Sequence, residues 1–205
     1  MVDGRLARVL ALIDAENSKD PNQEDGRPAA LRYSERMTEW LGRIAPDAGE
    51  ELQIAVRAQH LRRWEIPRDT YRMDRPGYHA WRNKLKVFHA ECVAELMRTA
   101  AYEDEAIAAV QSMVQKKRLR RDPNAQTLED VACLVFLTHY FTDFRRKHSE
   151  EKLLTILQRT WGKMSAEAQA TALGLPLPPA ERRLLEKALG EAPPLDPKTS
   201  SASGS

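Results

Sequence analysis

Cysteine is scarce in this sequence of 205 residues, which contains only Cys92 and Cys133. The chain has no C-x-x-C pair, so the common zinc-finger patterns are excluded. Both cysteines lie inside apolar segments with helical periodicity. We therefore expect reduced thiols packed in the core rather than a disulfide.

Long apolar runs and a large charge of one sign are also missing. No stretch of about 18 apolar residues occurs, so the sequence predicts no membrane-spanning helix and no membrane partner. The formal net charge of +2 falls short of the basic excess typical of nucleic-acid-binding proteins. The first residues lack the layout of a signal peptide, and we expect a cytoplasmic protein.

Strand-like alternation is equally scarce, whereas helical periodicity runs along most of the chain. We expect an all-α fold, a single globular helical bundle of about seven to nine helices over residues 1–190. A Pro/Ser-rich tail over residues 191–205 is predicted to be disordered. The predicted helices cover residues of about 2–16, 29–44, 47–63, 76–100, 104–117, 128–144, 150–163, 165–173 and 179–190.

Three polar residues, His60, His89 and Asp130, each lie on or near the apolar stripe of a different predicted helix. Burying a polar side chain costs free energy unless it is paired or binds something. Imidazole nitrogens and a carboxylate suit a divalent ion such as zinc, manganese or iron. The pattern predicts a metal site of these three residues, with Asp130 and Glu129 as the catalytic carboxylates.

Each of these residues also has a purely structural interpretation. A histidine on an apolar face is commonly a hydrogen-bonded core residue. The segment from Thr127 to Asp130 matches T-x-x-D, a capping box with Thr127 as the N-cap. In that role Asp130 would bind the backbone at the helix start and touch no ligand. Both interpretations stay open at this point.

Basic residues gather around Arg63 and in the run KKRLRR from Lys116 to Arg121. Guanidinium forks and lysine charges bind phosphate or carboxylate groups. We predict that Arg63, Lys116 and Lys117 bind an anionic small-molecule substrate, with phosphate as the expected charge. The alternative is that these side chains are solvated charges near helix ends.

Five segments of the sequence are distinctive: AVRAQHLRRWEIPR, AWRNKLKVFHAE, KKRLRRDPNAQTLEDVACLVFLTHYF, TWGKMS and LPLPP. With them the chain resembles the uncharacterised DUF4202 family, from LIDAENSKDPN to ERRLLEKAL. It is more weakly similar to the HD-domain metal-dependent phosphohydrolases. In that comparison the segment from Tyr33 to Met37 occupies the place of the family's first His. His60-Leu61 takes the place of its His-Asp pair, and Asp130 matches its last Asp.

These observations lead to hypotheses from different classes of protein. The leading one is a metal-dependent hydrolase acting on a phosphate-containing small molecule or nucleotide, because a bound ion activates water. The alternative is a non-enzymatic helical module that binds an anionic ligand, RNA or a partner protein. A third is a metal-dependent oxygenase, since histidine and carboxylate ligands also suit iron.

Overall fold

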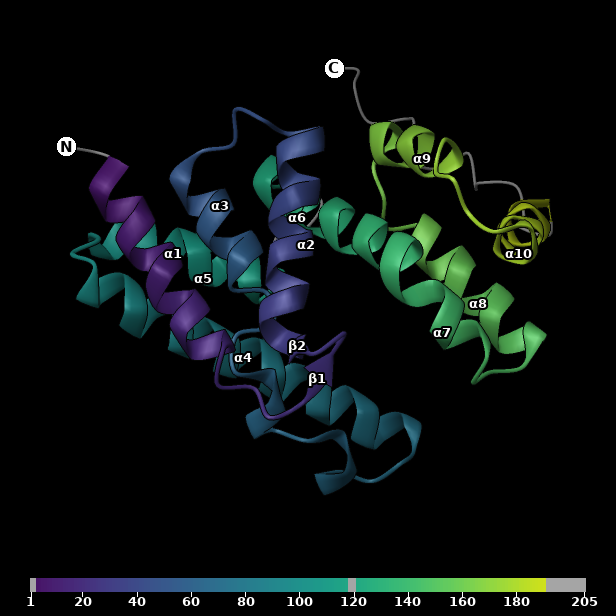
Figure 1. The fold of residues 1–205 in the computed structure, drawn as a ribbon, viewed down its shortest axis with the longest axis horizontal. Coiled ribbons are helices and arrows are strands. Elements are labelled where there is room, and N and C mark those ends of the chain that lie inside the picture. Colours follow the sequence, from purple (N-terminus) through teal and green to yellow (C-terminus); the bar gives the residue numbers. More distant parts are fainter. Residues whose placement is uncertain (1–2, 118–120, 191–205) are drawn as a thin grey trace, which may run out of the picture.

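The computed structural model describes residues 3–117 and 121–190 and confirms the predicted all-α fold (Figure 1). The tail predicted to be disordered lies outside these residues. Within them, no helix has both the length and the apolar character needed to cross a membrane. The helices are α1 (Asp3–Asn17), α2 (Ala29–Ile44), α3 (Glu50–Arg57), α4 (Arg75–Thr99), α5 (Asp104–Val114), α6 (Pro123–Val135), α7 (Phe141–Arg145), α8 (Glu150–Trp161), α9 (Ala166–Leu173) and α10 (Pro179–Gly190).

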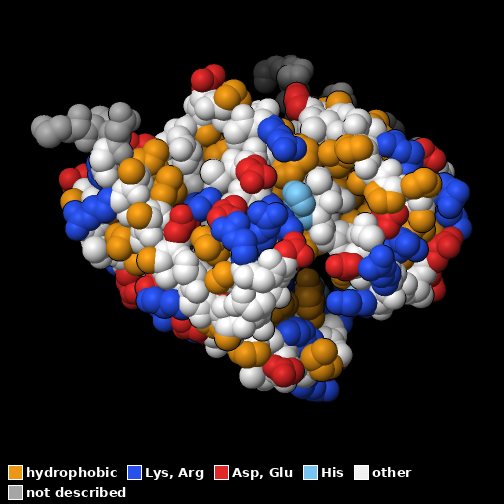
Figure 2. All heavy atoms as spheres, viewed as in Figure 1, with side chains coloured by type: hydrophobic (Ala, Val, Ile, Leu, Met, Phe, Trp, Pro, Cys, Tyr) orange, Lys and Arg blue, Asp and Glu red, His pale blue; other side chains and the backbone are white. Residues whose placement is uncertain are grey.

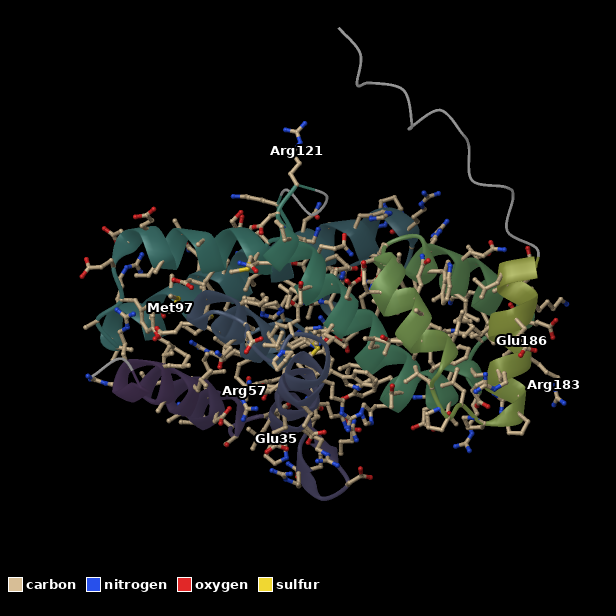
Figure 3. The ribbon with its side chains drawn as sticks, turned by 90° about the horizontal axis from the view of Figure 1, so that it is seen from above. Glu35, Arg57, Met97, Arg121, Arg183 and Glu186 are labelled. Carbon is tan, nitrogen blue, oxygen red and sulfur yellow. The ribbon has the colours of Figure 1, made fainter. Side chains whose placement is uncertain are left out.

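The helices pack around a continuous apolar core. Helix α2 packs on both α3 and α6, and α4 packs on α5. Helix α8 packs on α10, on the opposite side of the molecule from α1 (Figure 1). The charged side chains of Arg183 and Glu186 on α10 point outward (Figure 3). Helix α6 runs between these two regions, and its Val131, Leu134 and Val135 are fully buried. Helix α6 therefore lies at the buried centre of the bundle.

A short β-hairpin precedes α2. Strands β1 (Gln23–Glu24) and β2 (Arg27–Pro28) pair antiparallel. The connecting residues Asp25 and Gly26 both have positive φ, 53° and 73°, which is the backbone of a tight two-residue hairpin turn. Glu24 pairs with the buried Arg36 of α2. The hairpin is thus fixed to α2 at the edge of the site described below.

Helix α3 is shorter than the predicted helix over 47–63, because it begins after Gly49 and ends at Arg57. Turns follow, and Arg62 adopts a left-handed backbone with φ of 55°. His60 and Arg63 therefore lie on an irregular segment after α3 rather than on its apolar stripe.

Helix α6 begins five residues earlier than predicted. Its N-cap is Asp122, whose carboxylate accepts hydrogen bonds from the backbone N–H of Asn124 at 2.9 Å and of Ala125 at 3.4 Å. Pro123 occupies the first helical position, where its missing N–H costs nothing. The predicted capping box with Thr127 as the N-cap is therefore wrong, and Asp130 lies two turns inside the helix.

Candidate functional site

A pocket of about 930 Å³ opens where the hairpin, the segment after α3, α4, α6, α7 and α8 meet. Figure 2 shows a hollow on this face, lined with hydrophobic side chains and edged with charged ones. The charged lining residues are mostly basic, and aromatic rings make up much of the remaining wall. The basic lining residues are Arg63, Arg68, Arg82, Lys116 and Lys163.

Within the described residues, the guanidinium groups of Arg63 and Arg82 form no hydrogen bond or ion pair, whereas that of Arg68 donates to three backbone carbonyls. The Arg63 guanidinium lies over the Trp81 ring, 4.6 Å from its centroid. Burial, and then the charge of Arg82, lowers the pKa of Arg63 to about 10. Arg63 is still a cation at neutral pH, enclosed beside a second cation.

The acidic residues that line the pocket are committed to other groups. Asp20 accepts from the backbone N–H of Asn22 at 2.9 Å and of Ala30 at 2.8 Å. Glu24 pairs with Arg36 and accepts from the Tyr140 hydroxyl at 3.2 Å. Neither carboxylate neutralises Arg63 or Arg82. The pocket therefore holds uncompensated positive charge, and an anion is the ligand that would complement it.

Glu129 is the third acidic lining residue and is bound by two lysines. It is almost fully buried on α6, forms an ion pair with Lys116, and lies 3.5 Å from the Lys163 ammonium. Burial alone would raise the pKa of Glu129, but the charges of Lys116 and Lys163 hold it below its ordinary value. Lys116 lies just after α5 and has a left-handed backbone with φ of 58°. Three separate segments thus meet at the Glu129 carboxylate: the end of α5, α6 and the loop that carries Lys163.

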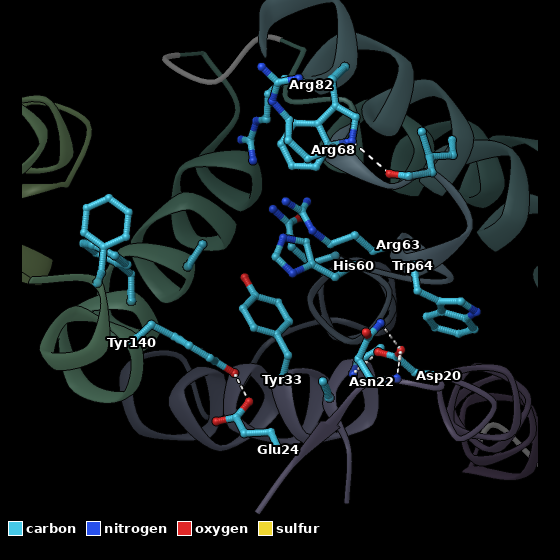
Figure 4. Close-up of a pocket in the computed structure, with 18 of the residues that line it drawn as sticks. Asp20, Asn22, Glu24, Tyr33, His60, Arg63, Trp64, Arg68, Arg82 and Tyr140 are labelled. Atoms are coloured by element: carbon cyan, nitrogen blue, oxygen red, sulfur yellow. Dashed lines mark hydrogen bonds between the residues drawn. The ribbon is translucent and has the colours of Figure 1, made fainter. Parts of the chain in front are cut away.

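His60 and Tyr33 form a stacked pair in the pocket, with ring centroids 3.9 Å apart and planes inclined by 16°. Burial, followed by the charge of Arg63, lowers the pKa of His60 well below its ordinary value. The imidazole is therefore neutral at neutral pH. Figure 4 shows the Tyr33 hydroxyl and the Arg63 guanidinium pointing into the same space.

His89 lies behind His60, with ring centroids 6.1 Å apart, and does not line the pocket. Its Nδ1 lies 2.7 Å from the Leu61 carbonyl oxygen, so Nδ1 carries the proton and donates it. This bond ties α4 to the segment that carries His60 and Arg63. Buried Nε2 has no partner in residues 3–117 and 121–190. His89 thus fits the structural interpretation, a hydrogen-bonded core histidine.

Asp130 joins α6 to the start of α9. Its Oδ1 accepts from the backbone N–H of Ser165 at 2.8 Å and from the Gln126 side chain at 3.0 Å. Gln126 also donates to the Lys163 carbonyl at 2.8 Å. These bonds fix the loop that carries Lys163 into the pocket. Asp130 itself is not among the residues that line the pocket.

The predicted metal ligands are His60, His89 and Asp130. Over the described ranges, no group of three or more His, Cys, Asp or Glu side chains is arranged to hold a metal ion. Asp130 already accepts two N–H groups, and His89 uses Nδ1 on a carbonyl. The residues do not fit a three-ligand centre, so no chemical step below is routed through a metal. A metal cofactor stays a prediction.

Of the three predicted substrate-binding residues, two line the pocket and one does not. Arg63 and Lys116 line the pocket, whereas Lys117 is exposed and does not. Arg118 and Arg120 of the basic run lie outside the described residues, and Arg121 projects away from the body of the protein (Figure 3).

Both cysteines are buried and free, as predicted. Burial raises the pKa of Cys133, which lines the pocket, to about 12, so its thiol is unreactive at neutral pH.

The sequence analysis did not single out Arg82 or Lys163. A signal for Arg82 does exist, because Arg82, Lys86 and His89 follow the i, i+4, i+7 spacing of one helix face. Burial, followed by the charges of Arg82 and Lys116, lowers the pKa of Lys86. For Lys163 no local pattern exists, since the loop between α8 and α9 brings it to the pocket.

Comparison with known proteins identifies a family but no characterised relative. A search of curated proteins found no match, and neither did a search of solved structures. The family model described as a domain of unknown function, DUF4202, matches residues 7–185. This match covers all of the elements that form the pocket. The chain belongs to the DUF4202 family.

Proposed function

We propose that the protein binds a phosphate-bearing small molecule in this pocket, with the phosphate at Arg63 and Arg82. The observation that carries the proposal is that Arg63 and Arg82, both half-buried in the pocket wall, lack a carboxylate partner in the described part of the chain. Keeping a cation out of water beside a second cation costs free energy, and a bound dianion would repay that cost. Guanidinium groups bind phosphate oxygens through paired hydrogen bonds.

Replacing Arg63 or Arg82 with Gln is expected to lower the affinity for phosphate about 10- to 100-fold, since each variant loses a charge-assisted hydrogen bond. The measurement is isothermal titration calorimetry with inorganic phosphate and with ribose 5-phosphate. Arg63→Gln should cost no more than about 1 kcal/mol of unfolding free energy, because only the contact with Trp81 is lost.

Arg98→Gln is the matched control, because Arg98 is an exposed residue of the same helix as Arg82. It should bind both ligands as the wild type does. The proposal fails if the wild-type protein binds neither ligand, or if Arg63→Gln and Arg82→Gln bind them as tightly as wild type.

Hydrolysis of the bound phosphate ester is a second candidate, and His60 favours it. Its neutral imidazole faces the pocket, where it can accept a proton from a water molecule that attacks phosphorus. The P–O bond to the alcohol breaks in the same step, and the leaving oxygen takes a proton from solvent water, so that the products are the alcohol and phosphate. In this version Arg63 and Arg82 would stabilise the charge on the phosphoryl oxygens. The metal-dependent and oxygenase versions, and binding of RNA or a partner protein, stay predictions.

Replacing His60 with Gln is expected to slow phosphate release from an ester about 100-fold while phosphate affinity changes less than twofold. Release from a panel of sugar and nucleoside phosphates is measured with a colorimetric phosphate assay. Arg98→Gln again serves as the control. If the wild-type protein releases no phosphate from any ester that it binds, hydrolysis is rejected and binding alone remains.

A further inference from the structure

The pocket is much larger than a phosphate group. At about 930 Å³ it lies near the upper end of the range of about 300–1,000 Å³ for sites of drug-sized ligands. The arginines and Trp81 form one part of its wall. In Figure 4, Tyr140 lies across the open space from Arg63 and Arg82. The chemistry of this facing wall therefore defines the part of the ligand that is not phosphate.

The facing wall comes from one continuous helical segment, α6, the π-turn Phe136–Tyr140, and α7. Its side chains in the pocket are apolar or aromatic except for Glu129, which the lysines neutralise. All of them except the buried Cys133 and Glu129 are partly exposed. The wall residues are Ala132, Cys133, Phe136, Tyr140 and Phe144.

The π-turn keeps two phenyl rings on this wall. Phe136 and Phe144 are eight residues apart, which would place them about 80° apart around a regular α-helix. A π-turn accommodates one additional residue, so the divergence falls to about 20° and both rings line the pocket. Turns of this kind are frequent at functional sites.

The rings of the wall are held in place before any ligand binds. Phe136 and Phe144 contact each other edge to face, with centroids 5.6 Å apart and planes inclined by 78°. The Tyr140 hydroxyl donates to Glu24 at 3.2 Å, and the Tyr140 ring lies 5.8 Å from that of Tyr33. A flat ring that enters the pocket thus meets preorganised aromatic surfaces, which favours stacking.

On the basis of the proposed function, we propose that the ligand is a nucleoside monophosphate or a phosphate ester of that size. Its flat ring would lie on the wall of α6, the π-turn and α7, and its phosphate at Arg63 and Arg82. Tyr33 also lines the pocket, and its hydroxyl lacks a hydrogen-bond partner within residues 3–117 and 121–190. A hydroxyl group of a sugar complements this atom.

The test compares AMP with ribose 5-phosphate, which has the same sugar and phosphate but no ring. Calorimetry on the wild-type protein should show AMP binding at least about tenfold more tightly, because stacking of one base contributes on this scale. Phe136→Leu removes a flat ring but keeps an apolar side chain. Ala132→Leu instead fills space at the wall. Each variant should lower AMP affinity about tenfold and leave ribose 5-phosphate affinity within twofold.

Retained binding of ribose 5-phosphate shows that a variant is folded. Ala170→Leu, an exposed substitution of the same kind on α9, is the control for Ala132→Leu and should change neither affinity. If AMP and ribose 5-phosphate bind the wild type equally, or if the wall variants bind AMP normally, the ring site is wrong while phosphate binding stands. If neither ligand nor inorganic phosphate binds the wild type, both proposals fail.

Discussion

Replacing Glu129 with Ala lowers the free energy of unfolding by about 3 kcal/mol, the expected cost of removing one partner from a buried ion pair. Glu129 is nearly inaccessible to solvent, and the Lys116 side chain is only 16% exposed. Without the carboxylate, the Lys116 ammonium remains enclosed in a pocket that already contains Arg63 and Arg82. Lys163 is 53% exposed and contributes little, so we take the lower end of the usual range.

Added phosphate should restore part of this stability, because an anion can take the place of the missing carboxylate beside Lys116. Urea unfolding followed by circular dichroism measures both effects, with chloride matching the ionic strength in the phosphate-free samples. Glu91→Ala, an exposed substitution on α4, is the control and should unfold as wild type does. A Glu129→Ala variant as stable as wild type would show that Glu129 does not hold the lysines.

Local sequence signals were sufficient for most of the helices. Residues 29–44 and 179–190 were predicted with the bounds that the structure shows for α2 and α10. The error of five residues at the start of α6 arose because two start signals overlap. Asp122-Pro123 precedes Thr127 by one turn, and the earlier signal wins because its N-cap and N1 residues both fit the helix terminus.

Helical periodicity shows which face of a helix is buried, but not which faces meet. The sequence analysis grouped His60 with His89, and in the structure their ring centroids lie 6.1 Å apart. Asp130 lies on an inward face too, yet that face points toward the loop before α9 rather than toward the histidines. No pattern within α6 distinguishes these two directions, because the choice depends on how α8 and α9 pack.

The basic residues show the same limit. Arg63, Lys116 and Arg82 come from three segments, and each has an ordinary structural interpretation when it is considered alone. What marks Arg63 and Arg82 is the absence of a carboxylate partner within the described residues. That feature is a property of the assembled pocket, since it depends on Asp20 and Glu24 being committed to the backbone and to Arg36.

Lowering the pH from 6.5 to 4 is expected to cost the wild-type protein on the order of 3 kcal/mol of unfolding free energy through His89 alone. Burial lowers the pKa of His89 from 6.5 to about 4, although its bond to Leu61 acts in the opposite direction. Above pH 6.5 the residue is neutral in both the folded and the unfolded chain. As the pH falls through this interval, the unfolded chain takes up a proton that the folded chain does not, so stability is lost.

Below about pH 4 the folded chain is protonated as well, and His89 adds no further pH dependence. His60 acts in the same direction, since burial also lowers its pKa.

Urea unfolding at pH 7, 6, 5 and 4.5 measures the trend. Carboxylates contribute equally to the pH dependence of the wild type and of the variants. His89→Gln should be less stable at pH 7 but show a shallower decline, because the titrating group is gone while a donor for Leu61 remains. The exposed His79→Gln substitution should leave the slope unchanged, whereas a His89→Gln slope equal to that of wild type would contradict a neutral, buried His89.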